Sequence, residues 1–531
     1  MPLSPFTQIL RLTAPTVLLV SALGNHFVHA QTGQAEAQQD SPFHEETIAE
    51  VSSGSEFKGA MLTVSHLAWV ESMGGKHVLK LDGKPQGGMY DDIKDINFSA
   101  DDRHLIFLGK RAVNWVLVED GQERSPEYTL ITSAAFQPQG DSIVYGACQE
   151  KKCKLIIDGN ETGMEYEEIS YPKYSHNGKR LAYLAKRGGK WTAVVDGKEM
   201  GPLSDEVWGA AWGFSPDDSH FVYAARTGNA VVKTLVGGQG VKWSWLLDGN
   251  PGPAFTVISP ISFSSDGRHY AYAGGEVSKQ GLLKQETVGT VILDGQTLAT
   301  YQGKGIGGRM AVSMADGVRG LSSDLHGVST PQFNPEAKLV YAARREKGDV
   351  AIFVGSDAGP GFDEVLTGVA FTKDTQHFAY VARHGKDLVE VQDNKPGRSF
   401  SPKHNVSDVP WVYITSDAAH FAYQTVSGGD RYNSGGTPRA LRSVIIDGKE
   451  GPEYNANGIT SFGFDKNALH FTYTVIGAKG DRDLVNVDGH ESRLYDFAAY
   501  PRFTDDGKKF EFIARDGSRL LRVSYTLEVK N

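Results

Sequence analysis

The sequence has no excess of positive charge and no long apolar run beyond its first 30 residues. The net charge is −10, with 54 Lys and Arg against 64 Asp and Glu. This balance argues against a general nucleic-acid binder, because phosphate binding needs a concentrated positive surface. Downstream of the N-terminal segment no stretch approaches the ~18 apolar residues of a membrane span.

Several catalytic and ligand-binding motifs are also missing. No Gly-x-Ser-x-Gly elbow is present, which excludes a complete serine peptidase of the α/β-hydrolase type. The segment GKGIGG (303–308) lacks the Lys-Ser/Thr ending of a phosphate-binding loop. The segment GGDRYNSGG (428–436) has one carboxylate, too few for a calcium loop. We therefore expect no cofactor and no metal.

The N-terminus has the layout of a secretory signal peptide. Arg11 precedes the apolar run LTAPTVLLVSALG, and Val28 and Ala30 stand at the −3 and −1 positions of a cleavage site after Ala30. No cysteine follows the apolar run, which argues against a lipid anchor. We expect residues 1–30 to be the signal peptide, 31–42 a flexible polar leader, and the mature protein to be periplasmic or secreted and not membrane-spanning.

A short pattern recurs along most of the chain at a simplest spacing of 38 to 40 residues. It consists of an aromatic residue, a bulky apolar residue seven positions later and a Tyr or Phe two further, as in Phe98/Leu105/Phe107 and Phe214/Phe221/Tyr223. Nine copies are regular, a tenth is one residue shorter, and an eleventh at SHLAWVES keeps Leu67 and Trp69. Self-similarity at a fixed period of this size indicates a repeat architecture.

Each copy predicts four antiparallel strands. Segments such as RLAYLA and HFAYVA alternate with period two, which is typical of strands. In eight copies the third apolar segment ends in Asp-Gly, a strong hairpin signal because both residues tolerate positive φ. Four strands repeated at about forty residues form a β-propeller blade, and stacked blades bury their aromatic faces against each other.

The strings FSPDDSHFVYAA (214–225), FSSDGRHYAYAG (263–274) and YSHNGKRLAYLA (174–185) resemble the WD40-like repeat of TolB-type bacterial propellers. The resemblance covers about residues 43 to 525. It implies an all-β, β-propeller fold, and it says little about function, because such blades serve both scaffolds and enzymes.

Eleven copies exceed the four to eight blades of one usual ring. We therefore expect two tandem propellers, 43–300 with about six blades and 329–531 with about five, joined by the Gly-rich segment 301–328. One large irregular ring is the alternative. The last copy lacks a fourth strand, whereas SPFHEETI (41–48) resembles a fourth strand without its preceding three. Pairing of these two segments would join the chain ends.

Long insertions fall on one side of the blades. In an up-and-down blade, the link from strand two to three and the link from strand four to the next blade emerge at the same end. Only these links are long, in 226–246, 274–290, 301–328 and 424–443, with net charges of +3, 0, +1 and +2. Loops that grow on a rigid scaffold often bind ligands.

The inserted segments supply the candidate binding residues. Aromatic and Arg side chains are the types enriched at interface hot spots, and the candidates we select from the insertions are Trp243, Trp245, Arg431, Tyr432, Arg439 and Arg442. The alternative for Trp243 and Trp245 is that they extend a hairpin and pack on its neighbour.

Histidines recur just before strand two, at His66, His104, His220, His269, His377, His420 and His470. Five follow an Asp by three residues, at Asp101, Asp217, Asp266, Asp374 and Asp417. Equivalent points on neighbouring blades should lie on the order of 10 Å apart, so these histidines cannot share a metal ion. We expect each Asp to accept backbone N–H groups in its turn and to orient the imidazole.

The two cysteines, Cys148 and Cys153, flank QEKK in a predicted hairpin. Paired hairpin positions can meet disulfide distances, and an exported protein meets oxidising conditions, so we predict a disulfide rather than a redox centre.

Together these features favour an exported, non-catalytic scaffold that binds a protein, peptide or glycan of the cell envelope through its loop-rich side. The alternative is a propeller enzyme, a hydrolase or lyase, with an active site in a central channel.

Overall fold

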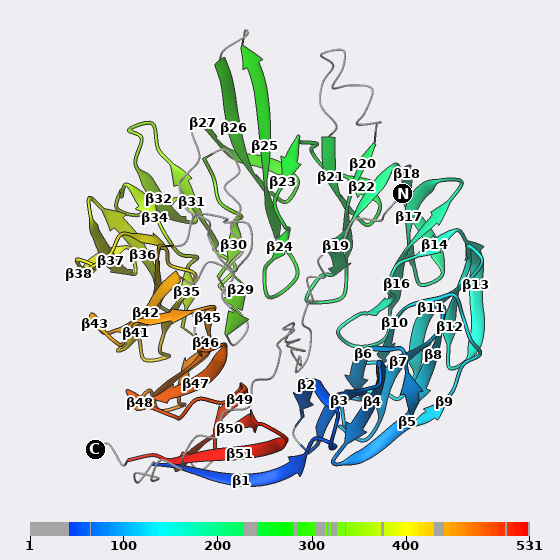
Figure 1. The fold of residues 1–531 in the computed structure, drawn as a ribbon. Helices are drawn as coiled ribbons and strands as arrows, with labels where there is room; N and C mark the ends of the chain where they lie inside the picture. The colour runs from blue at the N-terminus through cyan, green and yellow to red at the C-terminus, as the bar shows by residue number, and fades with distance from the viewer. Residues whose placement is uncertain are drawn as a thin grey trace. The chain divides into compact units, whose positions relative to one another are not determined.

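The computed structural model describes residues 42–63, 65–227, 242–280, 284–302, 314–315, 318–319, 327–334, 336–372, 376–428, 440–504 and 507–528. Within these residues every regular element is a strand (Figure 1). None of the described elements is a helix long and apolar enough to span a lipid bilayer.

The strands form eleven propeller blades, as the repeat predicts, and one additional two-stranded hairpin. The fold class is therefore an all-β propeller with eleven blades. By its internal contacts the chain divides into two units, residues 49–252 in unit 1 and residues 36–48 with 253–531 in unit 2. The predicted linker 301–328 lies within unit 2, mostly outside the described residues. The grouping of the blades into one ring or two stays a prediction.

Unit 1 contains blades 1 to 5, with four strands each in chain order except blade 4, in which two short strands, β14 and β15, both pair with β16. Their bounds are as follows: blade 1, β2 (Glu56–Leu62), β3 (Leu67–Met73), β4 (Lys76–Leu81), β5 (Lys84–Tyr90); blade 2, β6 (Asp92–Phe98), β7 (Leu105–Arg111), β8 (Asn114–Glu119), β9 (Gln122–Glu123); blade 3, β10 (Leu130–Phe136), β11 (Ile143–Gln149), β12 (Lys152–Ile157), β13 (Asn160–Tyr166); blade 4, β14 (Glu168–Ile169), β15 (Lys173–Tyr174), β16 (Leu181–Arg187), β17 (Lys190–Val195), β18 (Lys198–Ser204); blade 5, β19 (Glu206–Phe214), β20 (Phe221–Thr227), β21 (Lys242–Leu247), β22 (Asn250–Pro251).

Unit 2 contains blades 6 to 11. Their bounds are as follows: blade 6, β23 (Val257–Ile258), β24 (Ser262–Phe263), β25 (Tyr270–Gln280), β26 (Lys284–Leu293), β27 (Gln296–Gln302); the additional hairpin, β28 (Met314–Ala315), β29 (Val318–Arg319); blade 7, β30 (Gln332–Phe333), β31 (Leu339–Arg344), β32 (Val350–Val354), β33 (Asp357–Ala358); blade 8, β34 (Glu364–Val365), β35 (Ala370–Phe371), β36 (Phe378–His384), β37 (Asp387–Gln392), β38 (Lys395–Phe400); blade 9, β39 (Val406–Asp408), β40 (Val412–Ile414), β41 (Phe421–Ser427), β42 (Ala440–Ile446), β43 (Lys449–Glu450), β44 (Tyr454–Ala456); blade 10, β45 (Gly458–Phe464), β46 (Phe471–Lys479), β47 (Arg482–Val487), β48 (His490–Glu491); blade 11, β49 (Phe497–Phe503), β50 (Lys509–Asp516), β51 (Arg519–Thr526), β1 (Phe43–Glu50).

The aromatic and apolar residues of the repeat form the cores between neighbouring blades. Leu79 and Tyr90 of blade 1 pack with Leu105, Phe107 and Val118 of blade 2 in one buried cluster. Comparable clusters lie between other sequential blades within each unit. A single four-stranded sheet cannot bury both faces alone, so this stacking explains why the same strand positions are apolar in every copy.

The Asp-Gly turns have the predicted conformation. In the turn between β4 and β5, Asp82 and Gly83 have φ values of 49° and 84°, which matches the turn type that joins two-residue hairpins. The carboxylate of Asp82 also accepts the N–H of Leu67 at the start of β3, at 2.9 Å. The same bond recurs in nine blades, from Asp82, Asp120, Asp158, Asp196, Asp248, Asp294, Asp393, Asp447 and Asp488.

The N-terminal strand β1 completes blade 11 by pairing with β51, as the sequence indicates (Figure 1). Ion pairs hold this strand in place. The Glu45 carboxylate of β1 accepts bonds from Arg493 Nε at 2.6 Å and Nη2 at 3.0 Å, and from the Tyr495 hydroxyl at 2.8 Å. The bond to Arg493 lowers the pKa of Glu45, and partial burial opposes this shift.

We expect Glu45→Gln to lower the free energy of unfolding at pH 7 by about 1.5 to 3 kcal/mol, because it removes charged hydrogen bonds. The pKa of Glu45 is lowered on folding, so its contribution is present above pH 4.5 and is lost as the pH falls. Glu45→Gln should therefore destabilise less at acidic pH. Urea unfolding at pH 7 and at pH 3.5 measures both effects.

Glu46→Gln is the matched control on the same strand. Glu46 is 60% exposed and pairs with Arg522 at 3.4 Å, and an exposed pair of this kind contributes at most about 1 kcal/mol. Equal destabilisation by the two substitutions would contradict a specific role for Glu45 in holding β1.

Candidate functional site

The two ends of each blade differ. At the turn end, short turns join strand one to two and strand three to four. At the link end, strand two turns into strand three and strand four leaves for the next blade. In the described part of unit 1 the link end consists of the hairpin tips 74–75, 112–113, 150–151 and 188–189, and of the connections 91, 124–129, 167 and 205. The topology confirms that the long insertions belong to the link end.

Parts of the predicted insertions belong to paired strands in the structure. Residues 226–227 and 242–246 belong to the paired strands β20 and β21, so only 228–241 lies outside the described residues. Residues 424–427 and 440–443 likewise lie in β41 and β42. The segment 274–290 is largely an extension of the β25–β26 hairpin, paired as far as Gln280 and Lys284 (Figure 1).

Exposed large apolar side chains gather at the link end. Ten such residues are exposed among the described residues, and only Leu298 and Leu469 lie away from the link end. The other eight are Met73, Met89, Val113, Leu130, Met164, Leu203, Trp208 and Val257, with exposed fractions of 36% to 75%. Isolated exposed apolar residues are common, and an even scatter would place about half of them at each end. Their concentration at one end makes the link end the candidate functional site.

Seven of these eight residues belong to unit 1, where most links are short and some are held by hydrogen bonds. The Asp91 carboxylate accepts the Ala112 N–H at 2.7 Å and the Lys76 ammonium at 2.5 Å. Between blades 3 and 4, the Glu167 carboxylate accepts the Gly189 N–H of the β16–β17 hairpin at 3.1 Å. The link end of unit 1 therefore presents its apolar side chains beside short, hydrogen-bonded links.

Trp243, predicted as a binding residue, repeats a packing arrangement of other blades. It faces Arg226 across β20 and β21, and the guanidinium lies 5.5 Å from the ring centre. Two other blades have the same pair at the same register, Lys110 over Trp115 at 5.5 Å and Lys186 over Trp191 at 5.6 Å. This recurrence fits the packing alternative.

Trp245, also predicted as a binding residue, is 3% exposed, so its side chain lies in the core of this structure and not on the surface. Its position explains the burial. Trp245 stands three residues before Asp248, as Leu79, Leu117 and Leu155 stand before their own turns, and all of these are core residues. Counting back from the Asp-Gly turn would have revealed this in the sequence.

Arg442 also lies in a strand, with its Nε donating to the Ala456 carbonyl at 3.1 Å. Burial lowers the pKa of this guanidinium. The hollow beside it, lined by His404, Thr425, Glu450 and Glu453 among others, has room for about one water molecule. Arg431, Tyr432 and Arg439 lie outside the described residues.

The repeated histidines are held by a different Asp from the predicted one. In seven blades the imidazole Nδ1 lies 2.6 to 2.8 Å from the carboxylate of the Asp at the strand three to four turn. In blades 3 and 4 the Ser142 hydroxyl and the Arg180 guanidinium bind this carboxylate instead. The missed signal is the spacing, since His and Asp stand 16 residues apart in blades 1, 2 and 8, as in His66 and Asp82, and 18 apart in blade 10.

The Asp three residues before each His caps its own turn, as predicted. Asp101, Asp217, Asp266 and Asp417 each accept a backbone N–H at 3.1 to 3.2 Å and a Ser or Thr hydroxyl at 2.5 to 2.7 Å. The hydroxyl of Ser99 and then Arg103 lower the pKa of Asp101 to about 2. Asp374 lies outside the described residues.

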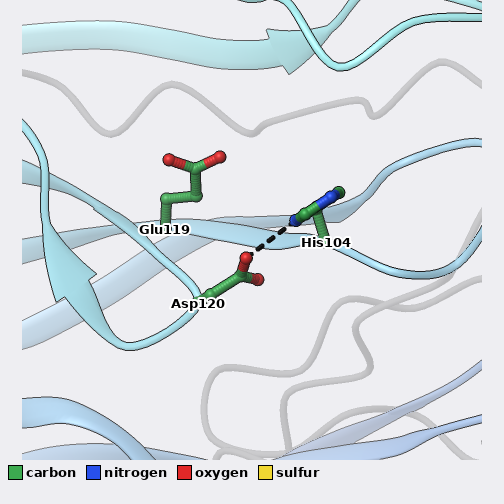
Figure 2. A group of neighbouring side chains, drawn as sticks. All are labelled: His104, Glu119 and Asp120. Atoms are coloured by element: carbon green, nitrogen blue, oxygen red, sulfur yellow. Dashed lines mark hydrogen bonds and ion pairs between the residues drawn. The ribbon is translucent and has the colours of Figure 1, made fainter.

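One group among the described residues has the composition of a metal site. His104, Glu119 and Asp120 bring potential ligand atoms within 4.8 Å of one another (Figure 2). These atoms already have partners. Asp120 bonds to His104 at 2.8 Å and to the Leu105 N–H at 2.9 Å, and Glu119 pairs with Arg124 at 3.0 Å. The Asp120 bond raises the pKa of His104. We assign the group a structural role, as in the other six blades with this pair.

The two cysteines form a bond at the link end of blade 3. Cys148 and Cys153 pair across β11 and β12, with their Sγ atoms 2.12 Å apart. Both are buried, and Cys153 lies against the Glu167 carbonyl of the following connection.

No protein-family model and no curated protein matches the sequence. Among solved structures, a eukaryotic initiation factor is similar at 11% identity over 72% of this chain and 93% of that one, with a TM-score of 0.36. The dihydro-heme d1 dehydrogenase NirN is similar at 15% identity over 64% and 70%, with a TM-score of 0.29. The hydrazine synthase of Kuenenia stuttgartiensis is similar at 10% identity over 60% and 96%, with a TM-score of 0.27. Likenesses this weak carry no argument about function.

We expect Trp245→Ala to lower the free energy of unfolding by about 3 to 5 kcal/mol, because it leaves a cavity in a blade core. Trp243→Ala, at a half-buried position, should cost clearly less, with about 1 kcal/mol from the lost contact to Arg226. Urea unfolding of both variants measures the difference. Unchanged stability in Trp245→Ala would show that the indole is not part of the core.

Proposed function

We propose that the protein is an exported, non-catalytic propeller of the TolB-like type that binds a partner of the cell envelope at the link end of its blades. The observation that carries this proposal is the concentration of exposed apolar side chains at the link end, eight of ten among the described residues. The long, locally basic insertions at the same end of blades 5 and 9 support it.

A protein or peptide is the partner class that this surface fits better than a glycan. Met89, Met164 and Leu203 are each about half exposed, at 49%, 50% and 46%. Unbranched Met side chains adapt to irregular apolar partners, whereas a glycan offers mainly hydroxyl groups. The short links of blades 1 to 4 hold these side chains in place, so little ordering is needed on binding.

Export is supported by the signal-like N-terminal segment and by the bond between Cys148 and Cys153, since such bonds persist in oxidising compartments. N-terminal sequencing of the mature protein tests this proposal, and the expected first residue is Gln31.

We expect the triple substitution Met89→Ser, Met164→Ser and Leu203→Ser to reduce partner recovery by about tenfold or more, since each removes apolar contact area. Its Tm should stay within a few degrees of the parent because these side chains are exposed. Cross-linking and co-purification of the mature protein from its native envelope measures recovery.

The matched control is Leu298→Ser with Leu469→Ser, two similarly exposed residues away from the link end, at 47% and 42%. A third variant replaces 228–241 and 429–439 by short Gly-rich turns and leaves β20, β21, β41 and β42 intact. Equal recovery with the triple variant and the control would contradict binding at the apolar surface. Full recovery after loop replacement would remove the insertions from the proposal.

A further inference from the structure

One buried position in blade 8 differs from its equivalents in the other blades. The residue three positions before the strand three to four turn is buried and apolar in eight blades, at Leu79, Leu117, Leu155, Ala193, Trp245, Val291, Val444 and Val485. In blade 8 the same position, before Asp393, is Glu390, which is 7% exposed. A carboxylate at a core position is costly unless it is paired and fully hydrogen-bonded.

Glu390 is only partly paired. Its Oε2 lies 4.0 Å from Arg398 Nη1 on the neighbouring strand β38, and the Gly448 N–H of blade 9 also bonds to the carboxylate. Its Oε1 is buried and has no hydrogen-bond partner among the described residues. Arg398 is shared, because its Nη1 also lies 3.5 Å from the Asp447 carboxylate of blade 9.

The side chain opposite Glu390 is also unsatisfied. The Tyr423 hydroxyl of blade 9 is buried and has no hydrogen-bond partner among the described residues. Equivalent tyrosines do have one. The Tyr223 hydroxyl donates to the Met200 carbonyl at 3.2 Å, and the Tyr473 hydroxyl pairs with that of Tyr454 at 3.2 Å. Burial raises the pKa of Tyr423, and the charges of Glu390 and Glu450 add to the shift.

Acidic groups dominate the surroundings of Glu390. From its own blade it faces Arg398, and from blade 9 it faces Asp447 and Tyr423, whose own pKa also responds to the charge of Glu450. Asp447 is already bonded to His420, and Glu450 lies 3.6 Å from Lys403. Burial, and then the Asp447 charge, raise the pKa of Glu390 to about 7, although Arg398 opposes the shift.

We propose that Glu390 makes the packing of blade 8 against blade 9 depend on protonation. The two blades pack tightly when the carboxyl group is protonated and less tightly when it is ionised. The neutral carboxyl group is tolerated among the apolar residues of this junction, which include Leu388, Val381 and Phe421. The ionised group leaves one buried charge that a distant, shared Arg398 does not balance.

The sign of the effect follows from proton binding. The unfolded carboxyl group releases its proton near pH 4.5, whereas the folded chain retains it up to about pH 7. Between these values the folded state binds more protons, so stability falls as the pH rises and levels off above the upper value. The loosening should be local, because the polar groups that face this side chain lie on β38 and β41 and in the turn 447–448.

Hydrogen exchange of peptides covering 387–392 and 421–427, corrected for the intrinsic rate, tests the proposal. We expect wild-type protection in these strands to fall by about tenfold or more between pH 5.5 and pH 8.5. Glu390→Gln, which keeps the shape without the charge, should remove this dependence and raise the Tm at pH 8.5. Glu390→Leu, the residue type of blades 1 to 3, should do the same.

Asp483→Asn is the matched control in blade 10. Burial raises the pKa of Asp483 to about 6, but its two oxygens accept the Gly477 and Ala498 N–H groups at 2.9 and 3.1 Å. This substitution should leave the exchange of 387–392 and 421–427 dependent on pH. A flat wild-type profile in these strands overturns the proposal even if no Glu390 variant folds. A pH dependence that persists in Glu390→Gln also overturns it.

Discussion

In nine of the eleven blades, the Asp carboxylate at the strand three to four turn makes the hydrogen bonds that fix the turn end of the blade. One oxygen accepts the first N–H of strand two, and the other receives an imidazole, a hydroxyl or a guanidinium. The turn needs positive φ, which Asp-Gly supplies, and the same Asp then fixes the neighbouring strand. Because nine blades share this device, the turn end is closed and uniform, and variation is left to the link end.

Comparison of equivalent positions within the chain separates packing from function. Trp243 and Trp245 look alike as aromatic residues near a long loop, yet one faces a cation as Trp115 and Trp191 do, and the other occupies the core position of Leu79. In a repeat protein, each residue can therefore be compared with the residues at the same position of the other blades. A residue is a candidate for a functional role when it differs from its equivalents and is exposed or lacks hydrogen-bond partners.

Period-two alternation, the Asp-Gly turns and the spacing of aromatic residues predicted the strands, the blade count and the pairing of the N-terminal strand with β51. These features are local or periodic, so the sequence contains them directly. The partner of each histidine was missed because it lies across the sheet, 16 to 28 residues away along the chain. The apolar link end was missed because exposure depends on what each neighbouring blade covers, as Met89 and the buried Tyr90 beside it illustrate.

Two buried acids show how far a blade core accommodates charge. Asp483 has backbone N–H donors for both oxygens, one from its own blade and one from the next, so the carboxylate replaces a missing strand contact. Glu390 has a longer side chain that reaches across the junction, where the Gly448 N–H bonds to its carboxylate but its Oε1 has no hydrogen-bond partner among the described residues. Backbone donors are fixed by the sheet, whereas the separation of two sheets is set only by side-chain packing. A buried carboxylate with a fixed backbone donor for each oxygen is therefore accommodated, whereas one with an unsatisfied oxygen between two sheets disturbs the packing of the blades.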